Sequence, residues 1–114
     1  MEIVELPEFS KDVKRLSKKY PSLPSDLNIV LKIIALKPDG RPPFSFTIKG
    51  LGLETTLIKV KKIASASFCG RGVQSGFRLI YAYQEIQNKI TLIEIYHKSE
   101  QSIEDRQRIF HNFQ

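Results

Sequence analysis

Five basic side chains fall on three neighbouring predicted strands, at positions that would bring them together: Lys59, Lys61, Arg78, His97 and Lys98. The two lysines of the first strand are two residues apart, so they project to the same side of it. Cations placed in advance around a phosphodiester hold its oxygens and offset the charge that develops in the transition state. A histidine adds proton transfer, because an unperturbed imidazole titrates near neutral pH. The pattern predicts a concave face that binds an anionic phosphodiester.

Arg78 is the charge inside the apolar run from Ser75 to Tyr83, which Gly76 opens and which is typical of a strand. Removing water from a guanidinium that has no partner is costly. Three interpretations follow: Arg78 reaches solvent at an edge, pairs with Glu94 on the next strand, or contacts an anionic ligand.

The other polar and aromatic side chains near this face each have a structural and a functional interpretation. Lysines that alternate along a strand also keep an exposed strand soluble and protect a sheet edge. A histidine at the end of a strand is commonly a surface residue. The tyrosines of the two last strands either pack in the core or stack on nucleic-acid bases: Tyr81, Tyr83 and Tyr96.

The elements that must position these residues follow from hydrophobic periodicity. Residues 2–6 predict a short strand, and apolar residues then recur every three or four positions between Phe9 and Tyr20, as in a helix. A second helix is predicted from Leu23, with Ser22 as its N-cap, and it ends before Pro38. The turn between the two helices is short enough to form a helical hairpin.

Four strands and a final helix are predicted after the turn-forming residues 38–43: strands at 44–48, 57–64, 76–83 and 89–97, then a helix that begins at Ser102 and runs to about Phe113. The last two strands form an antiparallel hairpin around Gln87 and Asn88. The predicted fold is α+β, with an N-terminal strand, a helical hairpin on a small, mostly antiparallel sheet of four to five strands, and a short C-terminal helix. The helices are expected on one face of the sheet, which leaves the other face for function.

Length and composition bound the class of protein. The chain has 114 residues, which predicts one domain over residues 1–114. Its 18 basic and 12 acidic residues give a net charge of +6, which favours polyanionic partners. The apolar runs are too short to span a bilayer and acidic residues interrupt the N-terminus, so we expect a cytoplasmic protein with no membrane partner.

A metal centre has few candidate ligands in this sequence. Cys69 is the only cysteine, so a zinc site of cysteine and histidine would need Cys69, His97 and His111 to converge. No pair of carboxylates is spaced like a metal-nuclease site, and no glycine-rich phosphate loop is present. We expect no metal and no cofactor.

The sequence resembles the RelE/ParE superfamily of type II toxins in four segments that follow one another in the same order: residues 9–16, 59–61, 75–81 and 95–99. The most specific part is Gly-Phe-Arg-Leu-Ile-Tyr, followed one hairpin later by Ile-Tyr-His-Lys-Ser. The resemblance extends from about Glu2 to Glu104, and the predicted order of elements agrees with the family's.

The resemblance implies a bacterial toxin that a cognate antitoxin neutralises. RelE-like members cleave mRNA, usually on the ribosome and without a metal, when the 2′-hydroxyl attacks the adjacent phosphate. By this resemblance Arg78 binds the phosphate, Lys59 and Lys61 position the RNA or act as base, and His97 or Lys98 assists proton transfer. The RNA-binding residues implied are Lys59, Lys61, Lys62, Arg71, Arg78 and Lys98.

The sequence also departs from the ribonuclease members of the superfamily. Lys98 and Ser99 stand where those members carry a second arginine, and no tyrosine follows Tyr96. Two alternatives therefore stand beside the nuclease. One is a ParE-like protein that inhibits DNA gyrase by binding, and the other is an inactive relative that still binds an antitoxin.

Overall fold

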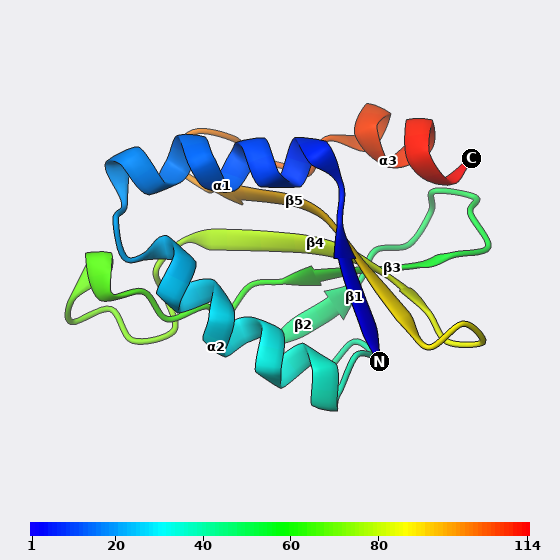
Figure 1. Ribbon diagram of the computed structural model, residues 1–114, viewed down its shortest axis with the longest axis horizontal. Coiled ribbons are helices and arrows are strands. Elements are labelled where there is room, and N and C mark those ends of the chain that lie inside the picture. The colour runs from blue at the N-terminus through cyan, green and yellow to red at the C-terminus, as the bar shows by residue number, and fades with distance from the viewer.

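A computed structural model describes all residues from 1 to 114 as five strands and three α-helices (Figure 1). In chain order these elements are β1 (Glu2–Glu5), α1 (Pro7–Lys19), α2 (Leu23–Leu36), β2 (Ser45–Thr47), β3 (Thr56–Val60), β4 (Phe77–Gln84), β5 (Lys89–His97) and α3 (Arg106–Phe113), with a short 3₁₀ helix, η1 (Ala66–Phe68), between β3 and β4. The predicted order of elements and the α+β class are confirmed. No helix is long and apolar enough to span a lipid bilayer.

The five strands form one mixed sheet in the order β1-β5-β4-β3-β2. β1 pairs with β5 in parallel, and every other neighbouring pair is antiparallel. The predicted pairing of the last three strands in sequence order is therefore confirmed. One residue of β5 bulges, because Ile80 pairs with Glu94 whereas Tyr81 pairs with Leu92.

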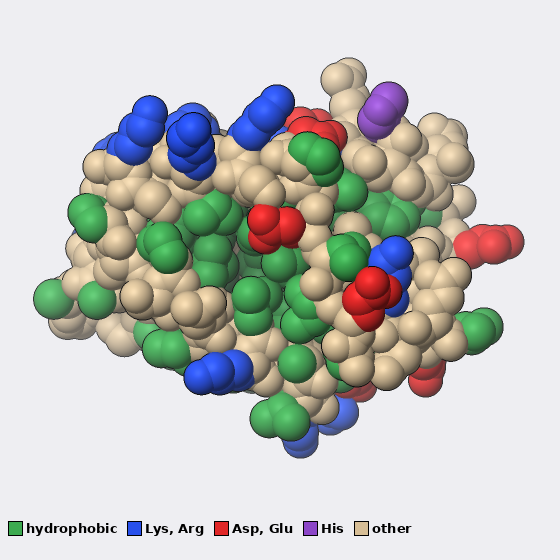
Figure 2. Space-filling model, in the orientation of Figure 1, with side chains coloured by type: hydrophobic (Ala, Val, Ile, Leu, Met, Phe, Trp, Pro, Cys, Tyr) green, Lys and Arg blue, Asp and Glu red, His purple; other side chains and the backbone are tan.

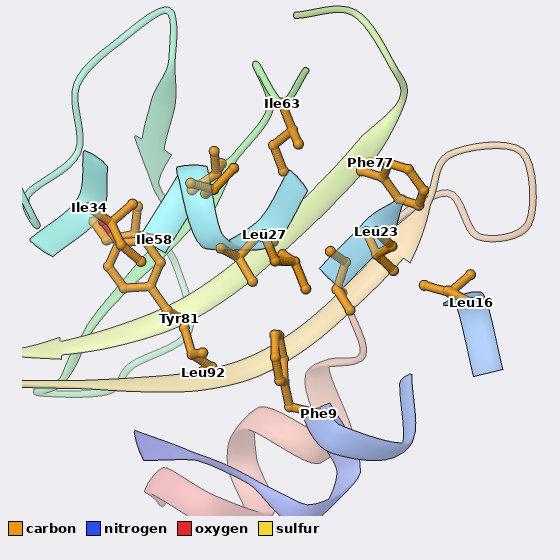
Figure 3. Close-up of a cluster of buried hydrophobic side chains, with 14 of the residues drawn as sticks. Phe9, Leu16, Leu23, Leu27, Ile34, Ile58, Ile63, Phe77, Tyr81 and Leu92 are labelled. Atoms are coloured by element: carbon orange, nitrogen blue, oxygen red, sulfur yellow. The ribbon is translucent and has the colours of Figure 1, made fainter. Parts of the chain in front are cut away.

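The helical hairpin of α1 and α2 covers one face of the sheet (Figure 1). Leu16, Leu23 and Ile34 are fully buried against strand residues such as Phe77 and Tyr81 in the larger of two core clusters (Figure 3). Each of these helices has a proline in its first turn, where a missing N–H group removes no helical hydrogen bond. Ser22 precedes α2 as predicted, but its hydroxyl makes no capping hydrogen bond to the helix.

The opposite face of the sheet is partly covered by α3, so the expectation that all helices lie on one face is wrong. Ile109 and Phe113, four residues apart on α3, pack in a second cluster with Ile80 and Ile93. An apolar patch on the outer face of the sheet favours this helix, because it removes both apolar surfaces from water. α3 begins at Arg106, and its N-cap is Asp105, three residues after the predicted N-cap Ser102.

An ion pair ties α1 to α3 around the edge of β5. Arg108 Nη1 donates to Asp12 Oδ2 over 2.7 Å and to the Ile93 carbonyl over 2.8 Å. Asp12 Oδ2 also accepts from the Ile95 N–H at 3.3 Å. These contacts occupy the edge of β5 beyond the end of β1, where unpaired backbone groups would otherwise be exposed.

The segment between β3 and β4 is fixed to the N-terminal end of α2. The Asp26 carboxylate accepts from Ser65 Oγ at 2.6 Å and from Ser22 Oγ at 2.8 Å. At the base of the segment, the Ser75 hydroxyl donates to the Ile63 carbonyl. The segment therefore has a defined position beside the sheet, although only η1 is regular structure in it.

Candidate functional site

An open pocket of about 370 Å³ lies on the outer face of the sheet, at the end where β4 begins and β5 ends. Its lining residues come from the region before β2, from β2, from the β3–β4 segment and from both hairpin strands: Pro43, Phe46, Lys61, Lys62, Val73, Gln74, Gly76, Arg78 and Lys98. Four of the nine are cations and none is an acid, so the pocket has a strongly positive lining.

The four cations of the pocket, Lys61, Lys62, Arg78 and Lys98, have no carboxylate within ion-pair distance. Like charges gathered around one hollow repel one another, and an anion that binds between them relieves that repulsion. We call this group the pocket cations below, and their arrangement makes the pocket a candidate anion site.

Arg78 contacts no carboxylate, so the proposed pair with Glu94 does not form. Glu94 instead accepts from Gln101 Nε2 and from the Asp105 N–H, each over 2.8 Å. The Arg78 guanidinium donates to the Phe77 carbonyl at 3.2 Å and to the Lys61 carbonyl at 3.4 Å, both through Nη1. These two contacts orient the side chain, and its other N–H groups are available to a ligand.

Lys62 lines the same pocket as Lys61, whereas strict strand alternation placed the two on opposite faces. β3 ends at Val60, and the N–H groups of Lys61 and Lys62 both donate to the Phe44 carbonyl, at 2.9 and 3.3 Å. Two residues that share one carbonyl acceptor do not alternate as in a ladder. The irregular end of β3 thus adds a cation to the site.

Gly76 brings the backbone close to two side chains at the base of the pocket. Its φ is +96°, and a Cβ added there would lie 2.7 Å from His97 Nε2 and 3.2 Å from Lys98 Cε. The Gly76 carbonyl accepts from the Lys98 N–H at 2.9 Å, which extends the β4–β5 ladder. Glycine is required here for both conformation and space, because it leaves room for the side chains of His97 and Lys98 beside it.

Lys59 lies on the same face as Arg78 but not in the pocket, because its ammonium is paired with an acid. Lys59 Nζ is 3.0 Å from Glu104 Oε1, and the two side chains are 16% and 5% exposed. Burial alone would lower the pKa of Lys59, but the Tyr96 hydroxyl and the Glu104 carboxylate outweigh it and raise that pKa. The resemblance implied that Lys59 could act as a base, but a lysine held as a paired ammonium is poorly placed for that role.

His97 lies on the opposite face of the sheet from Arg78, so the predicted cluster of five does not form. Phe77 is the cross-strand partner of His97, and both face the helical hairpin. The imidazole is 5% exposed and packs in one aromatic cluster with Phe68, at 5.0 Å, and Tyr20, at 5.6 Å between ring centroids. Its position in the register, rather than its residue type, removes it from the site.

Both nitrogens of His97 are used in hydrogen bonds to the backbone or to Ser99. The Ser99 N–H donates to Nδ1 over 3.1 Å, so Nδ1 is an acceptor and the ring proton is on Nε2. Nε2 then donates to the Ser75 carbonyl over 2.8 Å. The imidazole therefore holds the residue before Gly76 in place, and it has no free nitrogen to offer a substrate.

The remaining predicted residues lie outside the pocket. Arg71 is exposed on the β3–β4 segment and stacks on Phe68, with its guanidinium carbon 5.9 Å from the ring centroid. Tyr81 and Tyr96 are buried, and the Tyr81 hydroxyl donates to the Pro38 carbonyl, so the core interpretation holds for these two. Tyr83 is half-buried against the larger core cluster.

Phe46 and Gln74 line the pocket but were not expected there. Phe46 is on the short edge strand β2, opposite Lys59, and the residue is 36% exposed. A sequence signal for it did exist, because Phe46 is an apolar residue in a strand that pairs with a lysine strand. Gln74 gave no such signal, since the position of an irregular segment depends on its tertiary anchors.

Chemically, the site can hold a phosphate through a guanidinium and lysine ammonium groups. These groups stabilise added negative charge, and an ammonium can donate a proton to a departing oxygen. The pocket lining contains neither an imidazole nor a carboxylate. In the whole chain, no three His, Cys, Asp or Glu side chains come together in a way that could hold a metal ion.

The fold and the pocket together define a small α+β protein with a candidate anion-binding site. No family model matches the sequence, and no curated protein matches it. A solved structure with this fold is a protein described as a metal-bound toxin from Helicobacter pylori. The two share 20% sequence identity and a TM-score of 0.60, over 88% of this chain and 97% of that one. This likeness establishes the fold, and the RelE/ParE assignment stays a prediction.

Proposed function

We propose that the protein is the toxin of a type II toxin–antitoxin system and that it cleaves mRNA. The observation that carries the proposal is the pocket lined by four cations without acidic partners. An RNA backbone supplies the phosphates that such a pocket attracts. The fold that the chain shares with a bacterial toxin supports the same proposal.

The proposed reaction is internal transfer at one phosphodiester of the RNA. The 2′-oxygen gives its proton to solvent water and bonds to phosphorus while the bond to the 5′-oxygen breaks. The 5′-oxygen takes up a proton, so the products are a cyclic phosphate and a free 5′-hydroxyl. Because the nucleophile belongs to the RNA, this chemistry requires no metal-bound water, and binding plus charge stabilisation contribute most of the catalysis.

We assign each of the pocket cations a role in this reaction. Arg78 binds the non-bridging oxygens of the scissile phosphate, because a guanidinium offers planar, paired donors. Lys61 and Lys98 are ammonium donors on either side of it that stabilise the charged transition state and protonate the 5′-oxygen. Lys62 contacts a neighbouring phosphate. The ribosome is the proposed place of action, in keeping with the net charge of +6.

A cognate antitoxin is the proposed protein partner, and the groove between α1 and α2 is the surface we expect it to occupy. The groove measures about 230 Å³ and has apolar side chains such as Val13 and Leu31 on its walls. The lining itself contains one acid, Glu5, and no base. Basic side chains gather along α1 above the hollow (Figure 2). Lys18 and Lys19 lie in the last turn of this helix. An acidic amphipathic segment would match the apolar walls and the basic side chains of α1.

The second candidate is a protein without nuclease activity, either a toxin that inhibits DNA gyrase by binding or an inactive relative that still binds an antitoxin. The observation that favours it is the burial of His97, which leaves the pocket without a neutral-pH proton acceptor. The same fold can carry both activities, so the choice depends on the reaction itself.

Induction in a bacterium and cleavage by purified protein test the proposal. We expect growth arrest, mRNA fragments with cyclic phosphate and 5′-hydroxyl ends, and cleavage that persists in EDTA. Arg78→Ala should reduce cleavage about 100-fold or more, as loss of a transition-state donor does elsewhere. Lys89→Ala, a basic residue at the start of β5 and far from the pocket, is the matched control and should cleave like the wild type.

Three results would contradict the proposed nuclease function or favour one of the alternatives. Full toxicity of Arg78→Ala would remove the pocket from the mechanism. Growth arrest with intact transcripts and inhibited gyrase supercoiling would favour the binding-only toxin. Absence of toxicity in several hosts, with a folded protein that still binds the product of an adjacent gene, would indicate the inactive relative.

A further inference from the structure

Phe46 is an aromatic residue that faces the pocket and is not needed by the core. The residue is 36% exposed, and it belongs to neither of the two buried clusters. β2 is the edge strand of the sheet and has only three residues, so one side of Phe46 has no further strand beside it. Exposed aromatic rings next to polar groups commonly mark binding sites.

The pocket lining contains two chemically different kinds of residue. Arg78, Lys62 and Lys98 are basic, whereas Pro43, Phe46 and Val73 are apolar. Val73 is 48% exposed, so apolar surface in the lining is open to a ligand. A pure anion such as inorganic phosphate uses the basic residues only, and a ligand that uses both kinds must carry a negative charge and an apolar surface together.

Lys61 contacts the aromatic part of the lining. Its ammonium lies over one face of the Phe46 ring, 5.0 Å from the centroid, within the range of a cation–π contact. A planar group therefore stacks on the other face of the ring, and a negative charge attached to that group would lie beside the cations that line the same pocket. A nucleotide has this arrangement, with a flat base and a phosphate a few bonds away, and the volume of about 370 Å³ suits one nucleotide.

We propose that Phe46 is the stacking platform for one base of the bound RNA, next to the phosphate held by Arg78. The inference rests on the proposed RNA function and names the part of the site that contacts a base rather than the backbone. Stacking accepts every base because each has a π-face, and its strength sets modest preferences. Purines offer the larger face, so Phe46 should favour a purine at this position.

A single tryptophan reports directly on the stacking. The natural chain contains no tryptophan, so Phe46→Trp introduces one fluorophore whose emission a stacked base quenches. The probe is a tetranucleotide with 2′-deoxyribose at each position, which has no 2′-hydroxyl and cannot be cleaved by internal attack. The comparison probe is an abasic tetramer of equal charge. The control protein carries Ile86→Trp, in the fully exposed turn at the far end of β4.

The expected result is quenching of Phe46→Trp by the tetranucleotide but not by the abasic tetramer, and no quenching of Ile86→Trp by either. Phe46→Ala should weaken binding of the tetranucleotide by about tenfold, which is typical of one lost stacking contact. Its affinity for the abasic tetramer should stay unchanged, and adenine-rich probes should lose more than uracil-rich ones.

Failure of this inference and failure of the proposed function give different results. If Arg78→Ala abolishes binding while Phe46→Ala binds both probes like the wild type, the RNA function stands and the platform is overturned. Equal quenching by the tetranucleotide and the abasic tetramer would overturn it as well. If the wild type binds neither probe and cleaves no RNA, both the proposed function and the platform are wrong.

Discussion

Replacing Lys59 by methionine should destabilise the fold and leave RNA cleavage within a few-fold of the wild type. Methionine keeps most of the length of the side chain but removes the ammonium that lies 3.0 Å from Glu104 Oε1. An exposed ion pair is worth less than about 1 kcal/mol, whereas removal of one partner of a buried pair costs about 3–5 kcal/mol. The Glu104 side chain is 5% exposed, so the cost for a buried pair is the starting estimate.

Arg106 reduces this cost because it remains as a partner of the stranded carboxylate. Arg106 Nε lies 3.3 Å from Glu104 Oε2, and its own side chain is 51% exposed. We therefore expect Lys59→Met to lower the free energy of unfolding by about 2–3 kcal/mol. In the double variant Lys59→Met/Glu104→Gln neither charge is left unpaired, so the loss should be smaller than in either single variant.

The pH dependence gives the pair a second test. Burial alone would raise the pKa of Glu104, but the Lys59 hydrogen bond and charge outweigh it and lower that pKa. A carboxyl group with a lowered folded-state pKa contributes stability above its unfolded pKa, and this contribution is lost as the pH falls through the folded value. The advantage of the wild type over Glu104→Gln should therefore be full at pH 7 and shrink as the pH is lowered from about 4.5 to 3.

Urea denaturation of the wild type and the three variants, followed by circular dichroism, measures the free energies, and the RNA assay is run on the same samples. Cleavage reduced as strongly by Lys59→Met as by Arg78→Ala, in a protein that remains folded, would refute the structural role of Lys59. Equal stability of Lys59→Met and the wild type at pH 7 would refute the magnitude.

Two further substitutions, at Gly76 and Glu94, test the stability of positions close to the pocket. Gly76→Ala should cost about 2–4 kcal/mol from its positive φ and its contact with His97, whereas Gly70→Ala, with a φ of +84° and no atom within 4 Å of an added Cβ, should cost about 1 kcal/mol. Equal losses in urea denaturation would show that the contact contributes nothing. Burial raises the pKa of Glu94 despite its two donors, so the wild type should gain stability relative to Glu94→Gln as the pH falls from 7 toward 4.5. A difference that moves the other way would show that the buried carboxylate is ionised at little cost.

Much of the fold was predictable because the relevant signals are local. Helical periodicity and the prolines set the bounds of α1 and α2 to within a few residues of the expected ones. β3 was predicted to extend to Ala64 but ends at Val60, because Lys61 and Lys62 leave the ladder for the Phe44 carbonyl. A change of hydrogen-bond acceptor of this kind is not visible in side-chain patterning.

The site was predictable in part. Arg78, Lys61 and Lys98 were expected to meet and do line one pocket, and Arg78 was expected to have no easy internal role. The prediction for His97 did not hold because the pairing register places it beside Phe77, on the hairpin side of the sheet. Strands with side chains alternating between two buried faces require the exact register, and one bulge in β5 is enough to exchange the faces.

The sequence by itself determined the order of the elements, the antiparallel pairing of the last three strands and the presence of a charged residue, Arg78, inside an apolar strand. These features follow from propensity and alternation, which act between near neighbours. Only the tertiary structure decided which cations remain free. Lys59 meets Glu104 across 45 residues of sequence, and that contact takes it out of the anion site. It also decided that Phe46 adds apolar surface to the pocket lining, because a short edge strand gains its neighbours only when the sheet forms. Charge and residue type are written in the chain, whereas pairing and exposure arise from contacts between distant segments.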